Sequence, residues 1–192
     1  MDLQNINVKV PVEGDLKVDP GRFIEVFHRW VANQVVDGEL LIDVADYQHV
    51  PAGPGVVLVG LESDYSIDET DGSPGLRYNR KAPVDGTTAD RLHQALAAAA
   101  TACQLLETEF ASEGPLKFSR RAFELFINDR ALAPNTPETL AACKPELESF
   151  LTKLVGSHDF SLRFERDPRR RFGVQVNLAK PLDFAALQNA TA

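Results

Sequence analysis

The residues best suited to chemistry lie in one segment, residues 43–64, where carboxylates surround a single histidine. Its polar members are Asp43, Asp46, Tyr47, His49, Glu62 and Asp64. Histidine offers a nitrogen ligand and titrates near neutral pH, and carboxylate oxygens complete a mixed site that suits a divalent cation. Such a cation lowers the pKa of a bound water and supports hydrolysis. One hypothesis is therefore a metal-dependent hydrolase. Its metal ligands would be Asp43, Asp46, His49 and Glu62.

The register of two strands decides whether this metal site can form. The apolar runs at residues 40–46 and 56–62 predict two adjacent strands. If paired residue numbers sum to an odd value, Asp43 and Glu62 share a face and lie diagonally about 7–8 Å apart at Cα. If the sum is even, the two side chains point to opposite faces. Gly60 indicates a bulge or a close approach, either of which changes the register.

A structural role is the simpler explanation of the same residues. Asp43, Asp46 and His49 would then satisfy backbone groups near the turn, and Glu62 would pair across the sheet with Arg77 or Arg80. The spacing matches no metalloenzyme motif, and no glycine-rich phosphate loop or G-x-S-x-G nucleophile motif occurs. The sequence therefore leaves open whether the protein is an enzyme.

These residues belong to an acidic block without Lys or Arg, residues 30–76, which carries nine carboxylates. The whole chain has 28 acidic and 20 basic residues, so the block concentrates most of the net charge of −8. Carboxylates on ordered strands form a fixed negative surface that selects cations by electrostatics. Our leading expectation is a binding or accessory domain that uses this acidic hairpin, residues 37–71, for a cationic ligand or a basic partner.

The acidic loop expected at residues 63–75 combines oxygen ligands with glycine in a tight turn, as calcium sites do. It lacks the spacing and the terminal glutamate of an EF-hand, which favours an ordinary solvated loop. The sequence requires no cofactor, and a divalent cation is the one that it could accommodate.

Two further polar sets stand outside the acidic block. Asn128, Asp129 and Arg130 end a predicted strand, where they could line a pocket or form Asx turns and a helix cap. An arginine-rich set forms a basic counterpart to the acidic block. Its members are Arg163, Arg166 and Arg169–Arg171. The basic and acidic sets could pair within one molecule or across a homodimer, and a homodimeric structural protein is the third hypothesis.

Composition argues against several other classes. A pI near 5.0 argues against a nucleic-acid partner, because phosphate binding needs a basic face. Cys103 and Cys143 lie in helical patterns without metal-ligand spacing, which is typical of a reducing compartment. The apolar stretch at residues 95–102 is mostly alanine and too weak to span a bilayer, and the N-terminus lacks a signal-peptide pattern. We therefore expect a cytoplasmic protein with no membrane partner.

The periodicities predict a single α+β domain over residues 1–192. It would have a mostly antiparallel sheet of six or seven strands and about three helices on one face. The expected order is β-α-β-β-β-α-β-α-β-β, followed by a short flexible tail from about residue 185. The predicted strands are 6–12, 40–46, 56–62, 76–81, 118–128, 160–164 and 172–178.

Sequence signals also place the helices and one register. Asp19-Pro20 and Thr87 mark two helix starts. A third helix begins at Thr136-Pro137 and is expected to restart at Pro145. In the C-terminal hairpin, pairing Phe164 with Val174 places every apolar side chain on one face.

Overall fold

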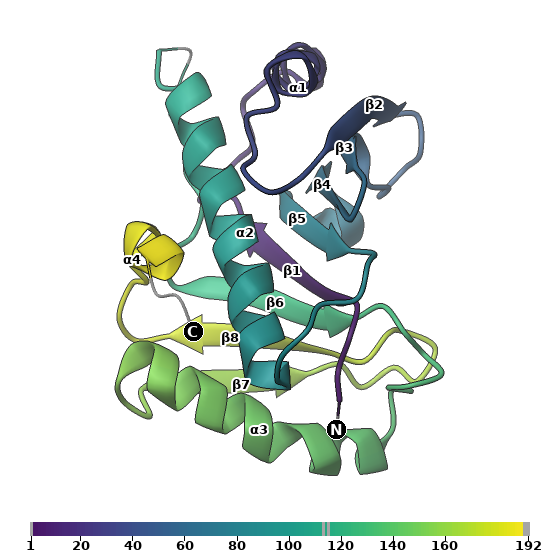
Figure 1. Cartoon of the computed structure of the whole chain (residues 1–192), viewed down its shortest axis with the longest axis vertical. Helices are drawn as coiled ribbons and strands as arrows, with labels where there is room; N and C mark the ends of the chain where they lie inside the picture. Colours follow the sequence, from purple (N-terminus) through teal and green to yellow (C-terminus); the bar gives the residue numbers. More distant parts are fainter. Residues whose placement is uncertain (1, 113, 115, 190–192) are drawn as a thin grey trace.

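The computed structural model describes residues 2–112, 114 and 116–189, which form an α+β domain around one antiparallel sheet (Figure 1). The strands are β1 (Ile6–Pro11), β2 (Leu41–Tyr47), β3 (Gly55–Gly60), β4 (Ser63–Asp68), β5 (Gly75–Arg80), β6 (Ala122–Ile127), β7 (Phe160–Phe164) and β8 (Gly173–Leu178). The helices are α1 (Pro20–Asn33), α2 (Thr88–Glu109), α3 (Pro137–Val155), α4 (Phe184–Asn189) and the 3₁₀ turn η1 (Thr70–Gly72). The predicted class is confirmed, with eight strands and four α-helices in the described residues.

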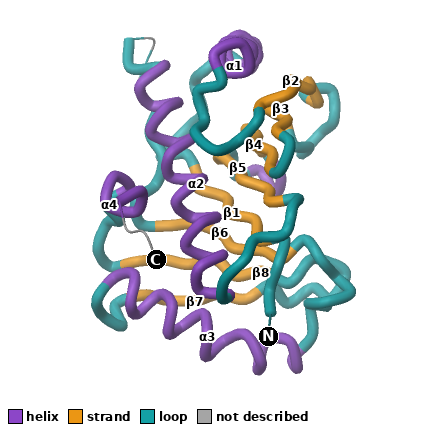
Figure 2. Tube along the Cα trace, in the orientation of Figure 1, coloured by secondary structure: helices purple, strands orange, loops and turns teal. Residues whose placement is uncertain are grey.

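The sheet has the strand order β2-β3-β4-β5-β1-β6-β8-β7, so β2 and β7 are its two edges. The helices lie against one face, with α2 crossing in front of β1 and β6 (Figures 1 and 2). Alternation along β1 shows how the faces differ: Val8 and Val10 are buried in the core, whereas Asn7 and Lys9 point to the opposite side. We call that opposite side the open face.

The predicted start of α2 is confirmed in detail. Thr87 accepts a hydrogen bond from the Asp90 amide, and the Asp90 carboxylate accepts one from the Thr87 amide. This reciprocal pair is a capping box, with aspartate in the place of the usual glutamate or glutamine. The predicted apolar seam of the helix is also buried. Its members are Leu92, Leu96, Ala99, Cys103, Leu106 and Phe110.

Strand β4 corrects the expected acidic loop. Residues 63–68 pair with both β3 and β5, and only η1 and its flanks remain as the connection. Tyr65 and Ile67 are buried on the helix side, while Asp64 and Asp68 lie on the open face. The alternation of a half-buried strand is present but short, because only Tyr65 and Ile67 alternate with the polar side chains of the open face.

The C-terminal third shows one confirmed register and two differences. Hairpin β7–β8 pairs Phe164 with Val174, as predicted. Helix α3 runs unbroken through Pro145 because burial of Phe150 and Leu151 holds the following turns in place. Residues 184–189 form α4 instead of beginning a flexible tail; its Phe184 side chain is buried. Residues 190–192 lie outside the described part.

Candidate functional site

The register of β2 with β3 separates the two ends of the expected metal site. A bulge between Leu41 and Asp43 shifts the register. Beyond it Asp43 pairs with Val59, so the paired residue numbers sum to an even value. Asp43 therefore lies on the open face. Glu62 follows β3, and its carboxylate accepts a hydrogen bond from the Arg80 guanidinium at 2.7 Å. The structure does not bring Asp43 and Glu62 together.

The remaining hairpin carboxylates bond nearby groups. Asp43 Oδ1 accepts from the Val44 amide at 2.8 Å, and Asp46 Oδ1 accepts from the Gln48 amide at 2.9 Å. Asp64 lies on the open face, where it accepts from Lys81 Nζ at 2.7 Å. These contacts have the form expected of structural roles.

His49 lies apart from the carboxylates. Its ring stacks against Tyr47 with centroids 6.4 Å apart at the exposed end of β2. Within residues 2–112, 114 and 116–189, no group of three or more His, Cys, Asp or Glu side chains is placed to share a metal ion. The geometry therefore offers no support for the predicted metal site or for a calcium site beside it.

A different site stands out at the β7 end of the sheet, where a cavity of about 1100 Å³ is lined by polar residues of the open face and by some apolar residues of the helix face; we call it the arginine basin. Its cationic lining residues are Lys9, Arg77, Arg130, Arg163, Arg166, Arg169, Arg170 and Arg171. Its carboxylates are Asp68, Asp71, Glu124 and Glu165. The described lining thus carries eight cationic side chains against four carboxylates, in a chain whose net charge is −8.

The floor of the basin is a buried ionic cluster from three strands. Lys9 Nζ of β1 lies 2.7 Å from Asp68 Oδ1 of β4, and Arg77 of β5 reaches Asp68 Oδ2 at 3.3 Å. Thr70 adds its amide and hydroxyl to the same carboxylate, at 3.1 and 3.0 Å. The cluster fixes the end of β4 to its neighbour β5 and, across β5, to β1.

The charge state of Asp68 follows from this cluster. Burial opposes ionisation, but the hydrogen bond and charge of Lys9, the charge of Arg77 and the Thr70 hydroxyl outweigh it. The pKa of Asp68 is therefore lowered, and the carboxylate stays ionised at neutral pH. One buried carboxylate is thus engaged by two cations, which leaves the cluster positive.

Above the floor, two guanidinium groups lie against one aromatic ring. Arg77 Cζ is 4.8 Å and Arg171 Cζ is 5.1 Å from the centroid of Phe126. Arg171 also donates to Asn128 Oδ1 at 2.9 Å. Burial lowers the pKa of Arg171, and the charge of Arg77 adds to this effect. Positive potential therefore converges at this point of the basin.

Three arginines around the rim have no anionic partner. Arg130, Arg163 and Arg166 make no ion pair and no side-chain hydrogen bond with any described residue. By contrast, Arg170 pairs with Asp71 and Glu165, and Arg169 pairs with its neighbour at position 167. The excess of positive charge is therefore carried by side chains that are free to meet an external anion.

Two polar groups beside the basin are buried without partners. Both amide atoms of Asn7 and the Nε of Arg77 make no hydrogen bond with the described residues. Asn7 is fully buried on the open face of β1, the central strand. Buried polar groups are normally satisfied, so each of these exceptions calls for an explanation, of which a bound water or ion is one.

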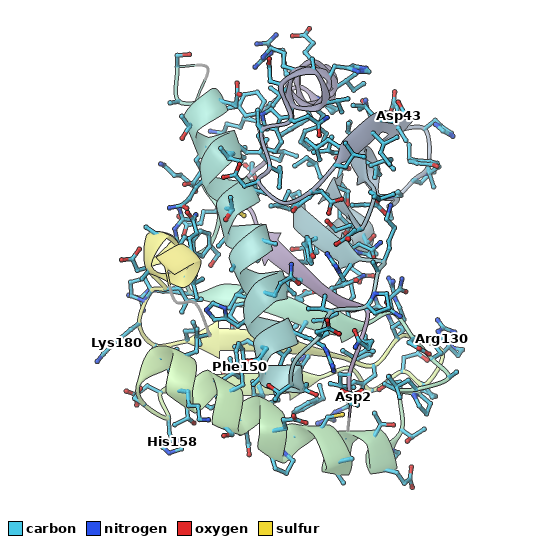
Figure 3. The ribbon with its side chains drawn as sticks, viewed as in Figure 1. Asp2, Asp43, Arg130, Phe150, His158 and Lys180 are labelled. Atoms are coloured by element: carbon cyan, nitrogen blue, oxygen red, sulfur yellow. The ribbon has the colours of Figure 1, made fainter. Side chains whose placement is uncertain are left out.

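The polar cluster predicted at the end of β6 divides between two roles. Asp129 Oδ1 accepts from the amides of Ala131 and Leu132, which makes it a turn residue. Asn128 positions Arg171, as described above. Arg130 lines the basin and projects where β6 leads into α3, well away from Asp43 on β2 (Figure 3).

The sequence indicated part of the basin, since the arginine-rich set was singled out as a basic region. Lys9, Arg77 and Phe126 were missed because each is one polar or aromatic residue on a strand. The available signal was alternation: Asn7 and Lys9 interrupt the apolar run of β1 at every second position.

Comparison with known proteins adds no identification, because no protein-family model, no curated protein and no solved structure matches this chain. Among the described residues, no helix is both long enough and apolar enough to cross a bilayer.

Proposed function

We propose that the protein is a binding domain whose ligand is anionic and occupies the arginine basin. The observation that carries this proposal is the charge of the basin lining. Its cationic side chains outnumber its carboxylates by four, although the chain as a whole is acidic. Like charges repel, so a cluster of this kind costs stability unless an opposite charge joins it. An anion supplied from outside is the missing partner.

The type of cation supports an anion with several oxygens. Seven of the eight cationic lining residues are arginines. The planar guanidinium donates in a fork that matches carboxylate and phosphate oxygens, whereas lysine acts as a point charge. Arg171 is held by Asn128, so its orientation is set before a ligand arrives.

The test is calorimetric titration of the protein with tripolyphosphate and with citrate at low ionic strength. We expect saturable binding that weakens as salt rises. The variants Arg163→Gln and Arg171→Gln each remove one lining charge, and each should raise Kd by about tenfold, equivalent to about 1.4 kcal/mol. Lys153→Gln, an exposed lysine on α3 outside the basin, is the matched control and should change Kd less than about twofold.

Two results would contradict the proposal. One is the absence of binding heat with either polyanion at low salt. The other is an equal loss of affinity in the Lys153→Gln control, because that would show that affinity depends on the net charge of the protein and not on the basin.

The acidic hairpin is a second candidate surface, for a cationic ligand or a basic partner. Leu40, Ile42 and Leu61 are 57%, 51% and 59% exposed there. Asp43 and Asp46 lie beside them and form no ion pair with a described residue. Exposed apolar residues among unpaired charges favour a protein contact. Reversing both charges with Asp43→Lys and Asp46→Lys should abolish capture of a basic partner, and capture that survives the change would refute this role.

A further inference from the structure

The two edges of the sheet are treated differently. On β2, Gln34 closes the outer edge: its amide donates to the Leu41 carbonyl at 2.9 Å and accepts from the Leu41 amide at 2.9 Å. Asp43 Oδ1 accepts from the Val44 amide on the same strand. Side chains thus occupy the backbone groups that an added strand would need, which is a known protection against edge pairing.

Strand β7 has no such closure. The Glu165 amide donates to the Gly173 carbonyl at 3.0 Å, and the Ala179 amide donates to the Asp159 carbonyl at 2.9 Å. The backbone N–H and C=O groups of the odd-numbered residues along β7 therefore point toward β8. In an antiparallel pair, the backbone groups of the residues in between point away from the partner strand. The outward amides of Leu162 and Phe164 accordingly form no hydrogen bond with any described residue.

This free edge is also the edge that borders the arginine basin. Arg163 pairs with Gln175 and lies on the open face, while Leu162 and Phe164 are half-buried on the helix face. All three residues line the basin. On the open face, Ser161 and Glu165 flank Arg163, and the Glu165 carboxylate is already engaged by Arg170 and by the amides of residues 166 and 167. A strand laid along β7 would therefore meet the free charge of Arg163 on one face and apolar side chains on the other.

We infer that β7 is a docking edge for an extended acidic segment of a partner protein, added to the sheet as a ninth strand. The inference rests on the proposed anion-binding function and names its ligand class. Main-chain hydrogen bonds to Leu162 and Phe164 supply affinity, and alternate side chains supply specificity. The segment carries an acidic residue opposite Arg163, polar residues at the alternate positions on either side of it, and apolar residues between them.

The experiment uses fluorescently labelled seven-residue peptides and measures anisotropy with the full chain. The first peptide alternates valine with polar residues, with glutamate at the central polar position and threonine at the others. The second has the same composition in two blocks. The third alternates as the first does but is N-methylated at the amides of one edge, which removes backbone donors and keeps every charge. Tripolyphosphate binding is measured beside them.

We expect the alternating peptide to bind at least about tenfold more tightly than the block and N-methylated peptides. Arg163→Glu should abolish its binding, whereas Lys153→Gln should leave it within twofold. Amide hydrogen exchange gives an independent readout, because Leu162 and Phe164 should slow on peptide binding while the outward amides of β2 should not. This measurement does not depend on any variant folding.

Equal affinity for all three peptides would overturn the added strand while leaving anion binding intact. Failure of the peptides and of tripolyphosphate together would overturn both. Concentration-dependent self-association of the chain that Arg163→Glu abolishes would assign the edge to a second copy, and would overturn the choice of a separate partner.

Discussion

Replacing Lys9 with methionine tests whether the ionic floor of the basin holds the sheet together. Methionine keeps the length of the side chain and removes its charge. The exposed fractions of the Lys9 and Asp68 side chains are 6% and 1%, so the substitution leaves a carboxylate in a buried place. The ion pair between Lys9 and Asp68 joins β1 and β4, which are not neighbours in the sheet, since β5 lies between them.

The expected loss follows from the contacts that remain. Breaking a buried ion pair by removing one partner costs about 3–5 kcal/mol. Asp68 keeps Arg77 at 3.3 Å and two hydrogen bonds from Thr70, so part of its charge stays compensated. We therefore expect Lys9→Met to lower the free energy of unfolding by about 2–4 kcal/mol at pH 7.

The assay is urea unfolding at pH 7, completed as a double-mutant cycle. Asp68→Asn alone leaves the Lys9 charge buried and should also destabilise. The double variant Lys9→Met/Asp68→Asn removes both charges and should lose less than the sum of the two single changes. The difference measures how strongly the two side chains depend on each other.

The reasoning fails if Lys9→Met changes the free energy of unfolding by less than about 0.5 kcal/mol, the range of ordinary surface changes. It also fails if the effects of the single variants simply add. Either result would mean that Lys9 and Asp68 are hydrated independently and that the basin floor is not a linked cluster.

Three further predictions concern stability. The folded pKa of Asp68 lies below its unfolded value of about 3.9, so its stabilisation is present above that pH and is lost as pH falls through the folded pKa. The gap in unfolding free energy between wild type and Asp68→Asn should therefore narrow progressively in urea titrations as pH falls below about 4. Asn7→Leu should raise the free energy of unfolding by about 1–3 kcal/mol, since it removes an unpaired buried amide, and a loss of stability would show that the amide has a partner. Gly55→Ala should lower the melting temperature far more than Gly38→Ala, because both have positive φ but only Gly55 places a new Cβ 2.2 Å from the Ile67 carbonyl oxygen; equal shifts by circular dichroism would contradict this.

The parts of the fold that could be predicted depend on local signals. The register of the β7–β8 hairpin followed from two alternating apolar runs, because pairing Phe164 directly with Val174 matches the two runs and places their apolar side chains on the same face. The start of α2 followed from Thr87 and Asp90, three residues apart. In both cases the residues that determine the structure are neighbours along the chain or across one turn.

The parts that could not be predicted depend on strand order. Asp64 and Asp68 suggest a solvated loop when read along the chain. In the folded sheet, Lys81 lies beside Asp64, and β5 and β1 bring Arg77 and Lys9 beside Asp68. The arginine basin likewise joins residues from β1, β5, β6 and the β7–β8 hairpin. No spacing in the sequence relates Lys9 to Arg163, since their proximity exists only in the folded sheet.

The acidic and basic sets were expected to pair either within one molecule or between two. Pairing between the two sets within the molecule is partial: Asp71 bonds Arg170, whereas Asp68 bonds Lys9 and Arg77, which lie outside the basic set. Asp43 and the other carboxylates of β2 lie at the far edge of the sheet. The charges are therefore separated along the sheet, negative toward β2 and positive toward β7. Such a dipole orients an approaching anion toward the β7 end, even though the net charge of −8 repels it at long range. Salt should then have two opposing effects on association, because screening weakens both the repulsion and the steering. The steering acts at close approach, where basin arginines without partners supply the attraction.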